Sequence, residues 1–219
     1  MLASSAQMVR PEDIEQVAER LAEDARQRFE SLYERMPSWE VPHPQPAVVE
    51  LLERGLIRGT VLDAGCGTGE NARLLASRGL QVFGLDVAHS AVGWARSKAQ
   101  ARGLPSARFL VGDALRLDLL GLCFDTVVDS GLFHSFTDLE RELYAVALAR
   151  VLRPGGLLHV LCWSDEQDGD DGPRRVSQAE LRASFTQGFA VQEIVPSRFV
   201  NNTHSGGARA WRASFERRG

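Results

Sequence analysis

Residues 60–70, with the sequence TVLDAGCGTGE, decide the fold of this chain. An apolar run typical of a buried strand passes into a glycine-rich turn, and a polar helix start follows. Glycines at such a turn allow a tight bend and let a ligand approach the backbone closely. A second apolar run, QVFGLD, ends in Asp86. Because a carboxylate at the end of the second strand can accept hydrogen bonds from both ribose hydroxyls, the two segments predict a site for a nucleoside-containing ligand.

Strand-like and helix-like segments alternate along the rest of the chain. Strands are expected at 60–65, 81–86, 107–113, 123–130, 157–163, 189–196 and 208–216. Such alternation with short turns predicts an α/β fold with a doubly wound, mostly parallel, Rossmann-like sheet of seven strands. No long helix separates the last two strands, and a parallel crossover needs about a dozen residues. We therefore expect an antiparallel terminal strand.

Capping boxes predict two helix starts, at Thr137 with Glu140 and at Ser177 with Glu180. The first of these helices is expected to bury a stripe at helical spacing: Leu139, Leu143, Val146 and Val151.

The N-terminal residues 1–46 are predicted to form a separate arm ahead of a domain at 47–219. Pro11 suits a first helical position, and apolar residues recur at helical spacing from Ile14 to Met36. The stripe requires a partner surface, either the core or a second subunit, so both a monomer and a homodimer are compatible with it. Residues 36–46 contain four prolines and are expected to form an extended connector.

Composition excludes several classes of protein. The chain has 219 residues, of which 44% are hydrophobic and 25% are charged, as in soluble globular proteins. It has neither a long apolar stretch nor a signal-peptide pattern, so no membrane association is expected. The net charge of −4 provides no basic surface for nucleic acid. Three widely spaced cysteines match no metal site and suggest reduced thiols in the cytoplasm.

The spacing of the glycines distinguishes between nucleoside ligands. A dinucleotide site favours the pattern G-x-G-x-x-G, but here Glu70 occupies the position of the third glycine. A carboxylate there would repel a pyrophosphate, and Asp63 adds a second negative charge. A cationic ligand fits better, and S-adenosylmethionine carries both a sulfonium and an ammonium group. An NAD(P)-dependent oxidoreductase, and a cofactor-binding protein without methyl transfer, remain alternatives.

At this point the sequence resembles the class I S-adenosylmethionine-dependent methyltransferases. The segment VLDAGCGTG is similar to their first motif, and similar segments follow in order up to LRPGGLLHVL, so that the resemblance covers residues 47–163. It implies that the cofactor contacts a set of residues at the strand ends: Asp63, Gly65, Gly67, Asp86, Val87, Asp113, Ala114, Asp129 and Ser130. Asp86 would bind the ribose hydroxyls, with Val87 against the adenine.

The arm and connector are similar to those of small-molecule methyltransferases of the thiopurine or halide/thiol type. There a short N-terminal segment closes over the cofactor, which implies that residues 1–46 form a lid and that Trp39 covers the cofactor.

The acceptor is expected to be a small molecule with a sulfur, nitrogen, oxygen or carbon nucleophile. His134 follows the fourth strand, where the acceptor pocket should open, and histidine suits proton removal near neutral pH. We therefore expect His134 to be the catalytic base if one is used. Phe133, Phe136 and Trp163 are candidate walls of the acceptor pocket. No metal is expected, because Asp129 lacks companion carboxylates.

Overall fold

The structure is a computed structural model that describes residues 11–219, with side chains described from residue 19 onward. Seven strands form one sheet in the order β3-β2-β1-β4-β5-β7-β6. Their bounds are β1 Thr60–Ala64, β2 Gln81–Asp86, β3 Ala107–Val111, β4 Phe124–Ser130, β5 Leu152–Trp163, β6 Phe189–Phe199 and β7 Ala208–Arg217. Strand β5 begins five residues before the predicted start, because Leu152 already pairs with Phe124 across an irregular register.

The sheet confirms the predicted topology. Strands β1 to β5 pair in parallel, whereas β7 pairs antiparallel with both β5 and β6. Strand β1 lies between β2 and β4, so the chain reverses its direction of travel across the sheet after β3. In open α/β sheets, ligands bind beyond the carboxyl ends of the strands at such a reversal. The glycine turn after β1 lies at this position.

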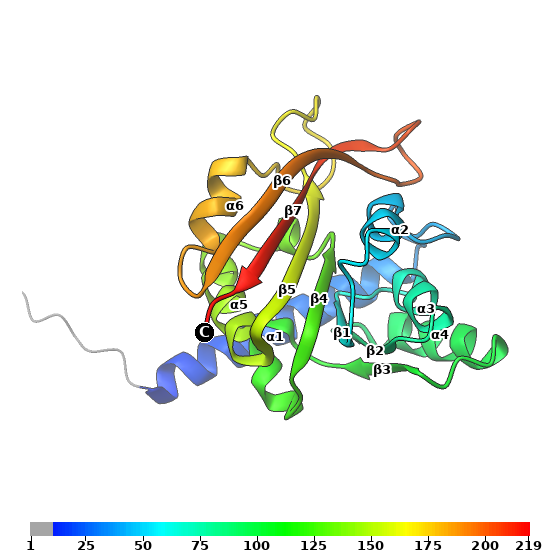
Figure 1. Cartoon of the computed structure of the whole chain (residues 1–219), viewed down its shortest axis with the longest axis horizontal. Helices are drawn as coiled ribbons and strands as arrows, with labels where there is room; N and C mark the ends of the chain where they lie inside the picture. The colour runs from blue at the N-terminus through cyan, green and yellow to red at the C-terminus, as the bar shows by residue number, and fades with distance from the viewer. Residues whose placement is uncertain (1–10) are drawn as a thin grey trace, which may run out of the picture.

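Helices cover both faces of the sheet (Figure 1). Their bounds are α1 Pro11–Tyr33, α2 Pro46–Glu53, α3 Glu70–Ser77, α4 His89–Ala101, η1 Ala114–Leu120, η2 Phe133–Ser135, α5 Asp138–Val151 and α6 Gln178–Ser184. Helices α2, α3 and α4 bury Val48, Leu75 and Val92 against one face. Helices α5 and α6 bury Leu148 and Leu181 against the other.

Helix α5 begins at the predicted capping box, but its predicted buried stripe is only partly right, since Val151 alone of the four residues is fully buried. Leu139 and Val146 are exposed, and the buried face instead carries Arg141, Tyr144, Ala145 and Leu148. Both sets have helical spacing, so periodicity alone could not choose between them. Tyr144 fills the space beside Phe136, which settles the rotation of the helix.

The arm is a helix that begins at Pro11, as predicted, although the side chains of the first stripe positions and residues 1–10 lie outside the described residues. The end of α1 packs against α4, where Tyr33 is buried beside Ala88 and Ala91. Trp94 of α4 is 41% exposed and meets the Tyr33 ring edge-on.

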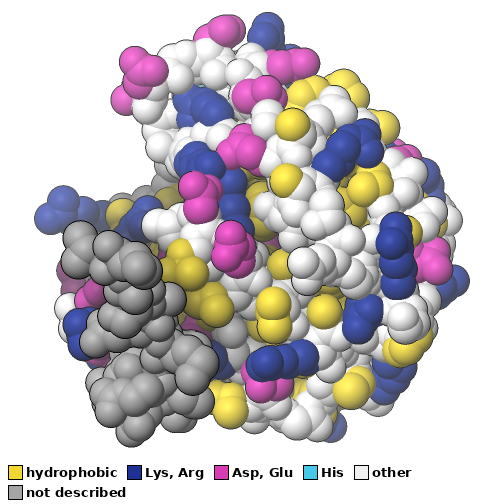
Figure 2. Space-filling view, turned by 90° about the vertical axis from the view of Figure 1, so that its left-hand side faces the viewer, with side chains coloured by type: hydrophobic (Ala, Val, Ile, Leu, Met, Phe, Trp, Pro, Cys, Tyr) yellow, Lys and Arg dark blue, Asp and Glu magenta, His cyan; other side chains and the backbone are white. Residues whose placement is uncertain are grey.

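The described surface has mixed charge. On the face shown in Figure 2, the described acidic and basic side chains are interspersed rather than gathered into a continuous basic field. None of the described helices is both long enough and apolar enough to cross a membrane.

Candidate functional site

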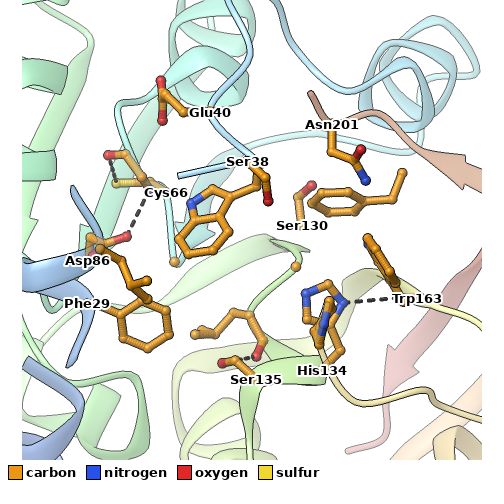
Figure 3. A pocket seen from close by; sticks show the side chains of 18 of the residues that line it. Phe29, Ser38, Glu40, Cys66, Asp86, Ser130, His134, Ser135, Trp163 and Asn201 are labelled. Carbon is orange, nitrogen blue, oxygen red and sulfur yellow. Dashed lines mark hydrogen bonds between the residues drawn. The ribbon is translucent and has the colours of Figure 1, made fainter. Parts of the chain in front are cut away.

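A cavity of about 1130 Å³ lies at the carboxyl ends of the parallel strands, between the sheet and the end of α1 (Figure 3). We call the part formed by residues 65–70 and the ends of β2 and β3 the loop half. The part lined by His134, Phe136, Trp163, Phe199 and His204 is called the aromatic half. The connector at residues 36–46 borders both halves, so one continuous space joins them.

The glycine loop brings bare backbone to the cavity. Gly65 and Gly67 adopt positive φ values of 69° and 52°. A Cβ at Gly65 would lie 2.9 Å from Leu132 Cβ, and one at Gly67 would lie 2.9 Å from the Tyr33 hydroxyl. Both positions therefore require glycine for conformation and for space.

Asp63 lies beneath this loop rather than in the cavity. It is buried at the end of β1, and its carboxylate accepts a hydrogen bond of 3.0 Å from the amide of Ala72 in α3. Burial raises the pKa of Asp63 to about 7. This carboxylate therefore ties β1 to α3 and fixes the loop between them.

Asp86 reaches the cavity itself. Its carboxylate accepts hydrogen bonds of 2.9 Å from the amides of Gly67 and Ala88, and burial raises its pKa to about 6. A carboxylate offers about four lone-pair sites. Asp86 can therefore hold the glycine loop and still accept hydrogen bonds from a ligand's ribose. Val87 lines the cavity beside it.

The turn after β3 contributes backbone rather than the predicted carboxylate. Gly112 and Ala114 line the cavity. The side chain of Asp113 instead accepts a hydrogen bond of 2.8 Å from the amide of Leu115 and pairs with Arg116 at 3.2 Å. Asp113 therefore caps η1, so the structure favours Ala114 over Asp113 for direct contact with a ligand.

The two predicted residues at the end of β4 also differ in position, since one is buried behind the turn and the other lines the cavity. Asp129 is buried and accepts hydrogen bonds from the amides of Leu132 and Phe133, and burial raises its pKa to about 7. Ser130 lines the cavity, and its buried hydroxyl has no partner among the described residues. Asp129 shapes the turn, whereas Ser130 faces the cavity.

The acidic groups give the loop half a preference for cations. Asp63, Asp86 and Asp129 are three buried carboxylates around one loop, and no described group of acids, histidines and cysteines there could hold a metal. A bound cation would favour their ionised forms. The sulfonium and ammonium groups of S-adenosylmethionine fit this set, whereas a pyrophosphate does not.

A cluster of charged residues, which the sequence did not reveal, fastens the connector to the loop half. Lys98 of α4 lies 2.9 Å from Glu70 and 3.3 Å from Glu40 of the connector. It also donates to the hydroxyl of Thr68, which in turn donates to Glu40. Lys98 is the single lysine of the chain, but nothing in the sequence places it against the connector.

Trp39 lies where the connector meets the cavity and also packs against the cluster that contains Trp163 and Phe199. Its role as a cover of the cofactor stays a prediction. The indole Nε1 is 3.4 Å from the Tyr33 hydroxyl, to which it donates, and the ring meets Phe29 and Tyr33 edge-on. Trp39 is half-buried and lines the cavity. The end of α1 and the connector thus form one aromatic wall.

His134 lies at the base of the aromatic half. Its Nδ1 accepts a hydrogen bond of 3.1 Å from the amide of Trp163, drawn as a dashed line in Figure 3. Burial, together with Arg141 and Arg175, lowers the pKa of His134 to about 3. The imidazole is therefore neutral, and its proton resides on Nε2. This arrangement favours a hydrogen-bond donor over the expected base, because the basic nitrogen already has a donor.

Two of the three predicted aromatic walls line the cavity. Phe136 and Trp163 do so, whereas Phe133 is fully buried and packs on Phe185 at 5.4 Å. The prediction of Phe133 as a pocket wall is wrong. Phe133 begins the 3₁₀ helix η2 after β4, and this turn directs its ring into the core.

The end of β6 and the segment after it supply two residues that sequence reasoning missed, Phe199 and Asn201. Phe199 meets His134 at 5.6 Å, and Asn201 lines the same part of the cavity. His204 meets the Trp163 ring at 5.0 Å. These residues lie late in the chain, and they reach the cavity only because β7 pairs antiparallel with both β5 and β6.

Comparison with known proteins identifies the family. Residues 61–156 match the family described as a methyltransferase domain. The chain is 35% identical to a 2-heptyl-1-hydroxyquinolin-4(1H)-one methyltransferase of Mycobacteroides abscessus, over 83% of this chain and 85% of the relative. It is 31% identical to a probable thiol methyltransferase of Arabidopsis thaliana, over 77% of this chain and 75% of the relative.

Solved structures of similar fold point to the same family. A structure described under the conversion of a disulfide bond into a thioacetal group during echinomycin biosynthesis matches with a TM-score of 0.81 and 38% identity, over 88% of this chain and 93% of the other. A magnesium protoporphyrin IX methyltransferase from Synechocystis with bound S-adenosylmethionine shares the fold, at a TM-score of 0.67. The chain belongs to the class I S-adenosylmethionine-dependent methyltransferases, with S-adenosylmethionine as its cofactor and a small molecule as its acceptor.

Proposed function

We propose that the acceptor is a planar heteroaromatic molecule, methylated on a hydroxyl oxygen. The observation that carries this proposal is the aromatic half, where Trp163, Phe199 and Phe136 line a space that opens directly onto the glycine loop. Aromatic side chains favour flat ligands through offset or edge-on ring contacts. The Mycobacteroides relative is named for a hydroxyquinolinone, which is such a molecule.

Methyl transfer needs little covalent chemistry from the protein. The bound cofactor supplies a methyl group on a sulfonium, and the chain aligns the acceptor oxygen in line with that bond. Such alignment is worth up to roughly 7–11 kcal/mol. The walls of the cavity also exclude water, which removes hydration from the attacking oxygen.

The roles of individual residues follow from their places in the cavity. We assign the ribose hydroxyls to Asp86 and the adenine to Val87 and the backbone of Ala114. The backbone at Gly65 and Gly67 receives the methionine and ribose portions, with Asp63 and Asp129 holding the turns behind them. The support is that these groups line the loop half or brace it.

Residues 1–46 are proposed to act as a lid. The end of α1 and the connector line both halves of the cavity, and Lys98 joins the connector to the loop. We further place the protein in the cytoplasm as a monomer or homodimer, where its free thiols, including buried Cys66 and Cys162, remain reduced.

Product analysis tests the acceptor class. The protein is incubated with S-adenosylmethionine and one of three acceptors: 1-hydroxyquinolin-4(1H)-one, a simple alkyl thiol or a demethylmenaquinone analogue. We expect the hydroxyquinolinone to gain one methyl group on oxygen, as followed by mass spectrometry and by the methyl carbon shift in NMR. Methylation of the thiol alone would contradict the proposal.

A sulfur acceptor is the second candidate. The probable thiol methyltransferase of Arabidopsis and the structure from echinomycin biosynthesis both concern sulfur, and the latter is 38% identical to this chain. The N–H group of His134 in the aromatic half favours oxygen, because sulfur is a weak hydrogen-bond acceptor. The same acceptor panel distinguishes the two.

A further inference from the structure

Three polar side chains in the aromatic half have hydrogen-bonding atoms that no described residue satisfies. They are the buried Oγ of Ser130 at the end of β4 and the buried Nδ2 of Asn201 after β6, together with Nε2 of His134 on η2, whose ring lines the cavity. Figure 3 shows them around one space, with Ser130 and Asn201 on one side and His134 on the other. Buried polar atoms are rarely left unpaired, so this set is expected to hold a ligand's polar group.

The tautomer of His134 is fixed by the backbone. Because the amide of Trp163 can only donate, Nδ1 must accept, and the hydrogen must lie on Nε2. Nε2 has no partner among the described residues, and the ring lines the cavity. The imidazole therefore presents an N–H group to the acceptor. It offers no lone pair there that could remove a proton.

The amide of Asn201 is fixed in a similar way. Its Oδ1 accepts hydrogen bonds of 3.0 Å and 2.8 Å from the amides of Thr203 and His204. The Nδ2 group must then point away from that turn, and in Figure 3 it is directed into the pocket. Asn201 is 8% exposed, and Nδ2 lacks a partner among the described residues. Nδ2 of Asn201 is therefore a second hydrogen-bond donor whose direction is fixed by the protein itself.

The charged groups around this space favour a negative ligand. The positive charges of Arg141 on α5 and of Arg175, in the segment before α6, help to lower the pKa of His134. Arg174 lines the cavity. Asp138 lies at the same wall but is paired with Arg174 at 2.6 Å. His204 and Asp171 also line this part of the cavity, and Glu180 pairs with both Arg141 and Arg174. The cation that has no acidic partner among the described residues is Arg175, which lies 4.8 Å over the Trp163 ring. The aromatic half thus has an uncompensated cation, whereas the loop half carries acids.

We propose that the acceptor binds as its oxyanion, held by the N–H groups of His134 and Asn201, and that no protein base removes its proton. This inference rests on the proposed hydroxyl acceptor. The proton leaves to solvent before binding. In the transfer step a lone pair of the oxyanion forms the new O–C bond, while the S–C bond breaks and its electron pair stays on sulfur. His134 and Asn201 are hydrogen-bond donors that select the ionised acceptor.

The first test is spectroscopic and needs no turnover. 1-Hydroxyquinolin-4(1H)-one is titrated with the wild-type protein and S-adenosylhomocysteine, at a pH one unit below the hydroxyl pKa of the free compound. We expect the bound compound to show the absorption spectrum of its anion, calibrated with the free compound at high and low pH. A neutral spectrum in the complex overturns the inference.

The two donors are then tested by measuring the dissociation constant of the same compound for variants of His134 and Asn201. His134→Leu removes the N–H and should raise the constant about 10- to 100-fold, since hydrogen bonds to charged groups are the strong ones. His134→Gln, which keeps an N–H donor, should restore most of that loss. Asn201→Asp keeps the oxygen that caps the turn but replaces the donor with an acceptor, and should weaken binding at least as much.

Exposed His89, which lies outside the cavity lining, supplies the control His89→Leu. Equal losses in His134→Leu and His134→Gln would contradict the donor role.

The pH dependence of kcat/KM separates the donor role from base catalysis. A nitro-substituted hydroxyquinolinone ionises at lower pH than the parent compound. We expect the rising limb of the profile to shift with the acceptor, in the wild type and in His134→Gln alike. A limb fixed at one pH for both acceptors would indicate a protein base. If the acceptor panel shows no O-methylation, the proposed function itself fails, whereas O-methylation with neutral binding overturns only this inference.

Discussion

Asp86 both braces the glycine loop and faces the cavity, so its removal should weaken cofactor binding directly. We expect Asp86→Ala to raise the dissociation constant of S-adenosylmethionine at least about tenfold, because a buried hydrogen bond to a carboxylate is worth roughly 1.5–3 kcal/mol. Isothermal titration calorimetry measures this. The control is Asp118→Ala, which removes an exposed carboxylate that pairs with Arg150. Unchanged affinity in Asp86→Ala would refute the ribose assignment.

The raised pKa of Asp86, about 6, predicts pH-dependent binding of the cofactor. A bound cation favours the ionised carboxylate, so binding lowers this pKa and releases a proton. The affinity for the cofactor is therefore highest above about pH 7. It declines as the pH falls through 6, by up to about tenfold per pH unit.

Calorimetry across pH 5 to 8 in two buffers of different ionisation enthalpy tests this linkage. S-Adenosylhomocysteine lacks the sulfonium and should show a weaker pH dependence. Identical dependence for both ligands would argue against an effect of the sulfonium charge.

Sequence reasoning located backbone-defined positions well and side-chain directions less well. Gly65, Gly67 and Asp86 were predictable, because a strand end and a tight turn determine where they lie. Asp113 and Phe133 lie next to the cavity but turn away from it, since Asp113 caps one 3₁₀ helix and Phe133 begins another, and packing sets how each of these helices is rotated. Asn201 was not predictable, because only the pairing of β6 with β7 brings it to the site.

At the scale of elements, the two capping boxes were predicted from sequence and are present, and they differ in position. Thr137 lines the cavity, whereas Ser177 lies away from it. Ser177→Ala should therefore lower the free energy of unfolding by about 1 kcal/mol without changing cofactor affinity.

Urea denaturation and calorimetry measure the two effects of Ser177→Ala separately. The matched control is Thr186→Ala, whose hydroxyl only donates to a nearby carbonyl at the surface. A large loss of cofactor affinity in Ser177→Ala would show that α6 also supports the site.

The connector depends on Lys98 for its position over the glycine loop. Lys98→Met keeps the length of the side chain but removes the ion pairs with Glu40 and Glu70. We expect the cofactor to bind about three- to tenfold more weakly, and the amides of residues 36–46 to exchange hydrogen faster. Exposed Arg78 provides the control Arg78→Met. Unchanged exchange in the connector would show that aromatic packing alone holds it.

Elements differ in how far sequence determines them. The strands and the long helices follow from periodicity and turn residues. Helix α2 escaped prediction, although Pro46 stands at its start, because the proline-rich connector runs directly into it. The rotation of α5 also escaped, since Tyr144 and Leu148 compete with Leu139 and Val146 for the core. Tertiary packing decided both.

Across the whole molecule, charge is divided within one cavity. The loop half contains buried Asp63, Asp86 and Asp129. Beside His134 in the aromatic half lie Arg141, which is paired with Glu180, and Arg175, which has no acidic partner among the described residues. A cationic methyl donor and an anionic acceptor would each meet a complementary environment, with the donor's methyl group between them. The fold achieves this by placing acids at the ends of β1, β2 and β4, and cations on α5 and the segment before α6.

Because the cavity is bordered by the sheet, α1 and the connector, a ligand bound there should stabilise the entire fold. A ligand at about 100 times its dissociation constant adds about 2.7 kcal/mol to the free energy of unfolding. For a chain of this size that corresponds to a rise in Tm of about 5–10 °C.

Differential scanning calorimetry should show this rise with S-adenosylmethionine and with S-adenosylhomocysteine, and a smaller rise in Lys98→Met at the same ligand concentration. NADH should leave Tm unchanged, because its pyrophosphate would meet Glu70 and the buried acids of the loop half. A comparable rise in Tm with NADH would show that these carboxylates do not exclude anions, and it would contradict the preference of the loop half for cationic ligands.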